Sequence, residues 1–113
     1  MKSPDGGERK VKMNKISVIV KHPGQRAYKT NISNTLENLQ KTVGGYIETV
    51  TVAKDACFIC DEEGKLKGKE YNFSFGGIDF VGTVILCGVN GDEFASFSLD
   101  FEDAKKLFPE MWR

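Results

Sequence analysis

The sequence predicts one α+β domain: a twisted, mainly antiparallel sheet of five or six strands, covered on one face by two short helices. Three observations predict it. Runs of β-branched residues, such as Ile16 to Val20, recur along the chain and indicate strands. Asn90-Gly91 stands between two such runs and is typical of a β-hairpin. Asn34 and Asp100 each precede apolar residues at helical spacing.

The first elements are predicted to be a hairpin and a helix. Ile16 to Val20 forms a strand, His22-Pro23-Gly24-Gln25 supplies a type II turn, and Ala27 to Ile32 returns as the antiparallel partner. Asn34 then caps a helix. Gly44-Gly45 ends this helix, because glycine adopts the left-handed cap conformation without steric cost.

The middle of the chain is predicted to hold two more strands and an irregular stretch. Tyr46 to Ala53 and Ala56 to Cys60 are rich in residues that favour strands. Asp61 to Lys65 is an acidic turn that contains a glycine. Residues 67–77 are interrupted by glycines, so we expect a loop with a short extended piece.

The last strands are predicted to form a hairpin whose two faces differ. Phe80 to Cys87 is the clearest strand, and with Asn90-Gly91 as the hairpin loop, Leu86 pairs with Ala95. The face that carries Leu86 is apolar, so we expect both helices to pack on it. The other face is mixed, and we expect three of its apolar side chains to remain exposed as an interface: Ile85, Cys87 and Phe94.

The closing segment is predicted to be a short helix. Asp100 caps it, Phe101, Ala104 and Phe108 recur along one side, and Pro109 ends it. We expect the large apolar surface of Trp112 to pack back on the body of the domain.

Composition limits the function classes. The chain has 113 residues with 16 basic and 16 acidic side chains, so it lacks the net charge that draws proteins to nucleic acids or anionic lipids. We therefore expect no nucleic-acid partner. Residues 1–14 are charged and have few apolar groups, so we expect a flexible arm there and a single domain over residues 15–113. No apolar run approaches the roughly 20 residues that span a bilayer. The start is polar, so a cytoplasmic protein without a membrane partner is expected.

Few residues suggest chemistry. Cys57 and Cys60 have C-x-x-C spacing, but in a strand residues three apart point to opposite faces, which favours packing over redox or metal binding. His22 is the only histidine and is interpreted as a turn residue. We expect no metal, no cofactor and no enzymatic activity. A carboxylate general base, at Asp61, Glu62 or Glu70, is the alternative.

Two signatures carry a resemblance to a known family. They are Val43-Gly44-Gly45-Tyr46-Ile47-Glu48, and Asp61-Glu62-Glu63-Gly64-Lys65-Leu66 followed by Tyr71-Asn72. With these motifs the chain resembles a family of small domains of unknown function in phages, plasmids and conjugative elements of Gram-positive bacteria. The resemblance implies a genetic context and no established activity.

Three functions follow as alternatives. The first is a non-enzymatic accessory protein of a phage or mobile element that binds a host protein, a small ligand or, through the mixed sheet face, a second copy of itself. The second is a protein that sequesters a cyclic nucleotide signal of host immunity. The third is a small enzyme. The side chains beside the signatures are the candidate ligand-binding groups: Tyr46, Glu48, Tyr71 and Asn72.

Overall fold

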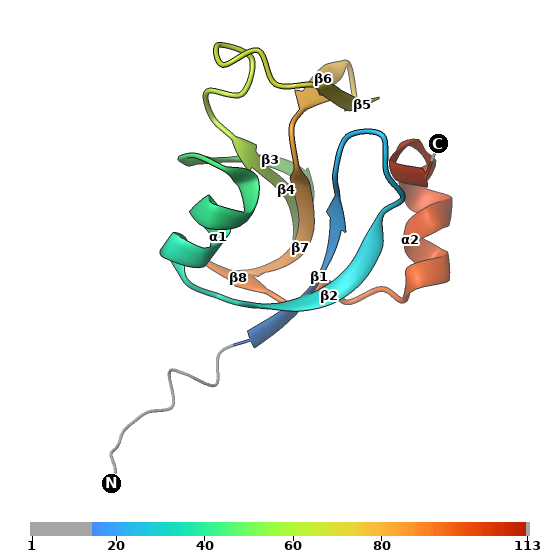
Figure 1. Ribbon diagram of the computed structural model, residues 1–113. Helices are drawn as coiled ribbons and strands as arrows, with labels where there is room; N and C mark the ends of the chain where they lie inside the picture. The colour runs from blue at the N-terminus through green and yellow to red at the C-terminus, as the bar shows by residue number, and fades with distance from the viewer. Residues whose placement is uncertain (1–14, 113) are drawn as a thin grey trace, which may run out of the picture.

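The computed structural model describes residues 15–112, which form an antiparallel sheet flanked by helices (Figure 1). The strand order is β2-β1-β7-β4-β3, and the short β8 pairs with the end of β7. The predicted α+β class and antiparallel sheet are confirmed, whereas the predicted arm of residues 1–14 lies outside the described residues. The strands of this sheet are β1 (Lys15–Lys21), β2 (Tyr28–Ser33), β3 (Ile47–Ala53), β4 (Ala56–Asp61), β7 (Val84–Asn90) and β8 (Glu93–Ala95).

The first turn forms as predicted. The Gln25 amide donates to the His22 carbonyl at 3.1 Å, and Gly24 takes a φ of 73°, which a side chain would strain. β1 and β2 then pair antiparallel from Lys15 opposite Ser33 to Val20 opposite Tyr28.

The central strands β4 and β7 are buried on both faces. Every residue of β4 is buried, and alternate side chains contribute to two separate cores. Phe58 and Leu86 belong to one core, which we call the aromatic core, and Ile59 and Ile85 belong to the other, the aliphatic core. A continuous apolar run is typical of a strand covered on both sides.

The helix α1 (Leu36–Val43) covers the aliphatic core with Leu39 and Val43. Its cap is Thr35, whose hydroxyl accepts the Asn38 amide at 3.1 Å, and not the predicted Asn34. The Asn34 side chain instead donates to the Phe94 carbonyl at 2.9 Å and so ties the start of the helix to β8.

The second helix, α2 (Phe101–Leu107), lies on the opposite face of the sheet from α1 (Figure 1). The prediction that both helices share one face is therefore wrong. Because α1 covers the other face, Ile85 and Cys87 are fully buried and Phe94 is half-buried, so the predicted exposure of this face is also wrong. The all-apolar run of β4 needed a cover on each side.

Phenylalanine rings dominate the aromatic core. Phe58 packs edge-on against four other rings, with centroid distances of 5.1 to 5.6 Å, a geometry that aromatic quadrupoles favour. These rings belong to Phe73, Phe75, Phe80 and Phe108.

The C-terminal segment begins with α2. Asp100 caps this helix as predicted, and after it the short 3-10 turn η2 (Pro109–Trp112) buries Met111. Trp112 packs on Phe101 at 5.3 Å, as expected.

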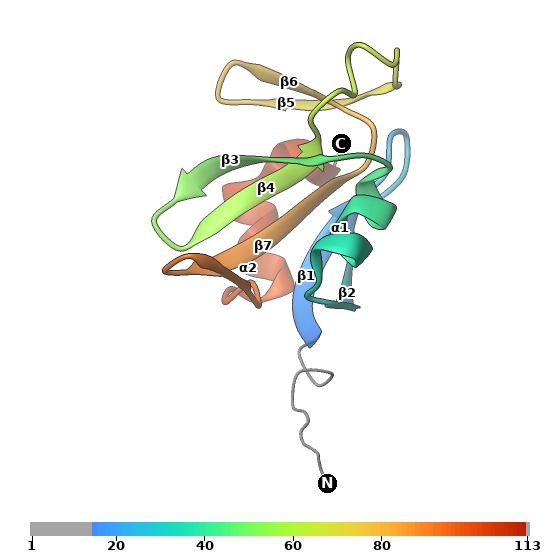
Figure 2. The same cartoon turned by 90° about the vertical axis from the view of Figure 1, so that its left-hand side faces the viewer.

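A separate hairpin replaces the loop predicted at residues 67–77. It consists of β5 (Tyr71–Phe75) and β6 (Ile78–Val81) and crosses the end of the main sheet (Figure 2). Gly76 and Gly77 form its turn with φ of 60° and 81°, a pair that side-chain-bearing residues rarely adopt. The glycines that suggested a loop are the residues that make the hairpin turn.

The pairing register of the β7–β8 hairpin differs from the prediction by two residues, because Ala95 lies opposite Gly88 and not Leu86. Asn90 pairs with Glu93 and Gly88 with Ala95, so the loop is Gly91-Asp92. The predicted pairing of Leu86 with Ala95 is wrong, because with this loop Ala95 lies opposite Gly88; Leu86 pairs with Ile19 of β1 on the same edge of β7. β8 therefore ends where β1 begins to pair.

Candidate functional site

One polar cluster joins the two signature motifs. Asp61 ends β4, and both Lys67 and Lys69 donate to its Oδ2, from Nζ atoms at 2.8 and 2.7 Å. The Glu63 amide donates to Oδ1 at 2.9 Å. Both oxygens of a carboxylate that is only 1% exposed are therefore satisfied.

The two lysines also contact the end of α1. Lys69 Nζ donates to the Val43 carbonyl at 2.8 Å, and Lys67 Nζ donates to the Gly44 carbonyl at 3.0 Å. The last carbonyls of a helix lack partners within the helix and carry its negative dipole end, so ammonium groups are favoured there. We call Asp61, Lys67, Lys69 and these two carbonyls the Asp61 corner.

Gly44 and Gly45 allow this close approach. Gly44 takes a φ of 83° as the cap of α1, as predicted. A Cβ on Gly45 would stand 2.5 Å from Asp61 Oδ1 and 2.6 Å from Lys67 Nζ. The first signature therefore ends a helix and also makes room for the second.

The pKa of Asp61 reflects these partners. Burial alone raises the pKa of the carboxyl group, but the hydrogen bonds from Lys67, Lys69 and the Glu63 amide lower it to about 2. Asp61 is consequently ionised at neutral pH and has little tendency to accept a proton. In these contacts it is a structural anion.

The loop over residues 62–69 projects from the Asp61 corner and ends beside the β5–β6 hairpin (Figure 1). Its own backbone bonds, such as Lys69 N–H to the Gly64 carbonyl at 3.0 Å, keep it compact. Leu66 lies on it and is 88% exposed. Among the described residues it is the most exposed of the large apolar side chains.

A cavity of about 190 Å³ lies between this loop, the β3–β4 edge and β6; we call it the loop–hairpin cavity. Apolar groups from Val50, Leu66 and Ile78 line it. Its charged lining comprises three carboxylates and one ammonium besides Asp61: Glu48, Glu62, Asp79 and Lys65.

Comparison with protein families gives one match. The family model of DUF3846, a domain of unknown function, matches residues 14–110. The chain belongs to this family. Neither the curated proteins nor the solved structures gave a match.

In this family member the four predicted ligand-binding residues do not converge. Glu48 lines the loop–hairpin cavity. Tyr46 is exposed beside a shallow groove along the end of α1. Tyr71 and Asn72 line a third depression, formed with η2. A single pocket that contains all four is therefore absent from residues 15–112.

Asn72 fastens the β5–β6 hairpin to the main sheet. Its Nδ2 donates to the Lys21 carbonyl at 2.9 Å and to the Gly82 carbonyl at 2.8 Å. Its Oδ1 is buried and has no hydrogen-bond partner within the described residues. Glu110 lines the same depression, and its Oε1 is likewise buried with no hydrogen-bond partner within the described residues.

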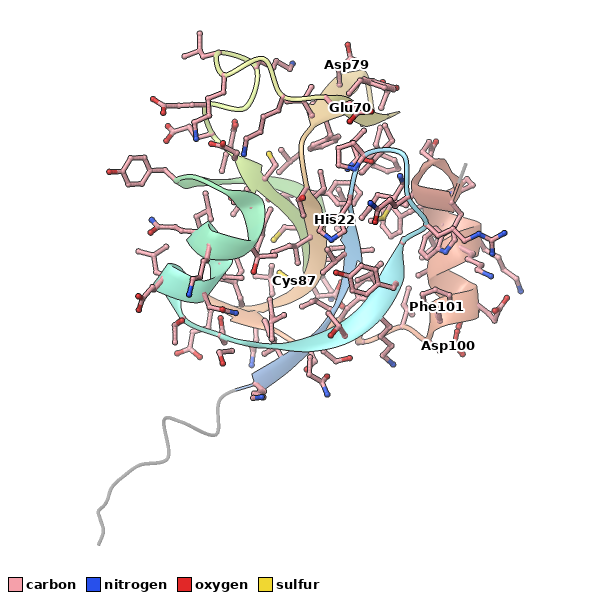
Figure 3. All side chains as sticks on the ribbon, viewed as in Figure 1. His22, Glu70, Asp79, Cys87, Asp100 and Phe101 are labelled. Carbon is pink, nitrogen blue, oxygen red and sulfur yellow. The ribbon has the colours of Figure 1, made fainter. Side chains whose placement is uncertain are left out.

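The cysteines lie where strand geometry predicts. Cys57 is in the aliphatic core and Cys60 in the aromatic core, on opposite faces of β4. Cys57 Sγ lies 3.8 Å from Cys87 Sγ, and both are free thiols in the aliphatic core. Cys87 lies on the side of the sheet that α1 covers (Figure 3). The hydrogen bond with Cys57, together with burial, raises the pKa of Cys87, and burial raises the pKa of Cys60 to about 11.

His22 serves the turn. Its Nδ1 is hydrogen-bonded to Thr83 Oγ1 at 2.8 Å, and its Nε2 to the Tyr28 hydroxyl at 3.1 Å. Over residues 15–112 no group of three or more His, Cys, Asp or Glu side chains is placed to hold a metal ion. Nor does any helix in this range have the length and apolar character needed to cross a membrane.

Four residues of these sites escaped the sequence interpretation: Leu66, Lys67, Lys69 and Glu110. Leu66 stood inside a signature, and an apolar residue at the end of an acidic turn was a signal for exposure. The lysines gave none, because their partner, the end of α1, is more than 20 residues away in sequence.

Proposed function

We propose that this chain is a non-enzymatic binding protein whose loop–hairpin cavity receives an apolar group of a partner protein. The single observation that carries the proposal is the placement of Leu66. It is 88% exposed, yet its loop is fixed at the Asp61 corner by two ion pairs. An apolar side chain on a loop that is already fixed binds without the entropy cost of ordering that loop, which suits an interface anchor.

The rim of the cavity indicates the chemistry of the partner. Glu48, Glu62 and Asp79 surround the apolar lining, and Lys65 is the one ammonium among these lining groups. Asp61 adds no free charge, because Lys67 and Lys69 pair with it. An apolar side chain flanked by basic residues would complement this surface.

The biological setting belongs to the same proposal. The signature motifs resemble small domains of phages and mobile elements, so we propose a cytoplasmic accessory protein that engages a host protein. The predicted mixed sheet face is not its interface, because Ile85 and Cys87 lie beneath α1.

Two leucine variants test the proposal. Proteins captured from host cells by wild type, Leu66→Ser and Leu107→Ser are identified, and the affinity of each purified candidate is then measured by calorimetry. Leu107 is also exposed but lies on α2, so Leu107→Ser is the matched control. We expect Leu66→Ser to weaken binding at least about tenfold and Leu107→Ser to leave it unchanged.

Equal affinities for wild type and Leu66→Ser would contradict the proposal. Unfolding curves of both variants show whether either loses stability. Light scattering on the wild type shows whether the partner is a second copy of the chain.

A protein that sequesters a cyclic nucleotide is the second candidate. Tyr71 and Asn72 share a depression and so offer a ring and an amide, but Tyr46 lies elsewhere and the carboxylate of Glu110 disfavours a phosphate there. A thermal-shift panel of cyclic dinucleotides and cyclic ADP-ribose isomers tests it, because a ligand that binds the native state raises Tm. No shift with any of them would remove this candidate.

An enzyme with a carboxylate general base is a weaker proposal. Asp61 has a pKa of about 2 and both oxygens occupied, whereas catalysis needs a base whose pKa lies near the working pH. Glu62 and Glu70 are exposed.

A further inference from the structure

We infer that the depression between β5 and η2 binds a cationic N–H donor, an ammonium or guanidinium group. This site is separate from the loop–hairpin cavity and does not depend on the function proposed there. It has a volume of about 320 Å³ and is lined by Tyr71, Asn72, Phe73, Ser74 and Glu110.

The orientation of Asn72 is fixed by its partners. Both Lys21 and Gly82 present carbonyl oxygens to it, so the donor end of the amide must face them. Oδ1 consequently points away from these carbonyls. It is buried, and no donor within residues 15–112 reaches it.

Glu110 also lines the depression and carries a second unpaired acceptor. Its Oε1 is also buried without a hydrogen-bond partner among the described residues. Native proteins rarely leave buried acceptors unpaired, and two of them on residues that line one small depression point to a missing donor.

The hydroxyl groups of the depression do not supply that donor. Ser74 Oγ donates to Asp79 Oδ1, so it must accept from the Tyr71 hydroxyl, which lies 2.7 Å away. Both hydroxyl hydrogens are thereby used within β5 and β6. The free polar atoms of Asn72 and Glu110 are acceptors only.

Charge and shape then define the ligand. Glu110 brings a carboxylate, and no lysine or arginine of residues 15–112 lines the depression, so phosphates are disfavoured. Phe73 is buried, and the exposed Tyr71 offers a ring on which a cation can rest. An alkylammonium or alkylguanidinium ion supplies several N–H donors and the positive charge together.

The test is an NMR titration of the full chain with propylguanidinium, propylammonium and the neutral isostere propylurea. We expect saturable shifts of the Asn72 side-chain amide with both cations, and at least about tenfold weaker binding of propylurea. Glu110→Gln should weaken cation binding at least about tenfold, whereas Glu102→Gln, which removes an exposed carboxylate from α2, should not.

Wild type and Arg113→Ala are both titrated, so that the guanidinium three residues after Glu110 in the sequence cannot mask the site by competition. Saturable cation binding by either supports the inference, and its absence from both overturns it. Equal affinities of the wild type for propylurea and propylguanidinium would also overturn it, and this comparison requires no variant. Water alone at the two oxygens in a crystal grown with propylguanidinium would overturn it too.

Discussion

Two polar corners attach the β5–β6 hairpin and its preceding loop to the sheet, and they differ in how completely their hydrogen bonds are satisfied. At the Asp61 corner both carboxylate oxygens have partners, and two lysines also satisfy carbonyls at the end of α1. At Asn72 the amide nitrogen has two partners and the oxygen has none within residues 15–112. Figure 2 shows the hairpin that both corners hold.

The difference in hydrogen bonding distinguishes a corner that only holds the fold from one that also binds a ligand. A buried acceptor left unpaired costs about 1 to 3 kcal/mol, so a corner meant only to hold the fold should be fully paired. The Asp61 corner meets this condition. The Asn72 corner does not, which is why we assign the ligand to it.

The largest effect is expected from Asp61→Asn. The change keeps the shape but removes the charge that faces Lys67 and Lys69, so the free energy of unfolding should fall by about 3 kcal/mol. Urea unfolding at pH 7 measures it. Asp55→Asn, in the exposed β3–β4 turn, is the matched control and should change stability by less than about 0.5 kcal/mol. A loss as small as that of the control would show that the corner does not hold the fold.

Gly45→Ala should have the next largest effect. Its Cβ would meet Asp61 Oδ1 at 2.5 Å and push the carboxylate away from its lysines, so we expect a loss of about 2 kcal/mol. Thermal unfolding measures it. In an Asp61→Ala background the same change should cost much less, because the Asp61 oxygen is gone and the flexible Lys67 side chain, no longer paired with it, can move away. Equal costs in the two backgrounds would disprove this mechanism.

Lys69→Met should cost more than Lys67→Met. The Lys69 side chain is 24% exposed and that of Lys67 is 40% exposed, so water screens the second pair more. We expect losses of about 1.5 and about 0.5 kcal/mol. The double variant should lose more than the sum, because Asp61 then keeps no cation. Strict additivity would contradict a shared carboxylate.

Glu110→Gln should have the smallest effect on stability, within about 0.5 kcal/mol of wild type. Its Oε1 has no partner to lose within the described residues. Urea unfolding checks it beside the cation titration. A large loss of stability would place Glu110 in the fold instead of in a binding site.

Local geometry was predictable from the sequence, and contacts between distant segments were not. The end of α1 at Gly44 and the cap Asp100 followed from residue preferences within one turn. The hairpin over Tyr71–Phe75 and Ile78–Val81 was missed, because isolated glycines in a strand also signal a loop. The length of β8 depended on β1, which occupies the edge of β7 at Leu86.

The candidate sites were less predictable for the same reason. Nothing near Asp61 in the sequence indicates that the end of α1 will lie against Lys67 and Lys69. Asn72 and Glu110 line one depression only after η2 packs on β5. One signal was present: the unbroken apolar run from Ala56 to Cys60 in β4 indicated a cover on both faces, and hence a buried Ile85.

The most direct test of the central claim is an NMR titration of the Asp61 side-chain carboxyl carbon. The folded pKa of about 2 lies below the usual 3.8, so folding favours the ionised form. The corner then stabilises the fold fully above about pH 4, and this stabilisation is lost as the pH falls through about 2. The account predicts that Asp61 remains ionised down to about pH 2. A midpoint at or above 3.8 would contradict it.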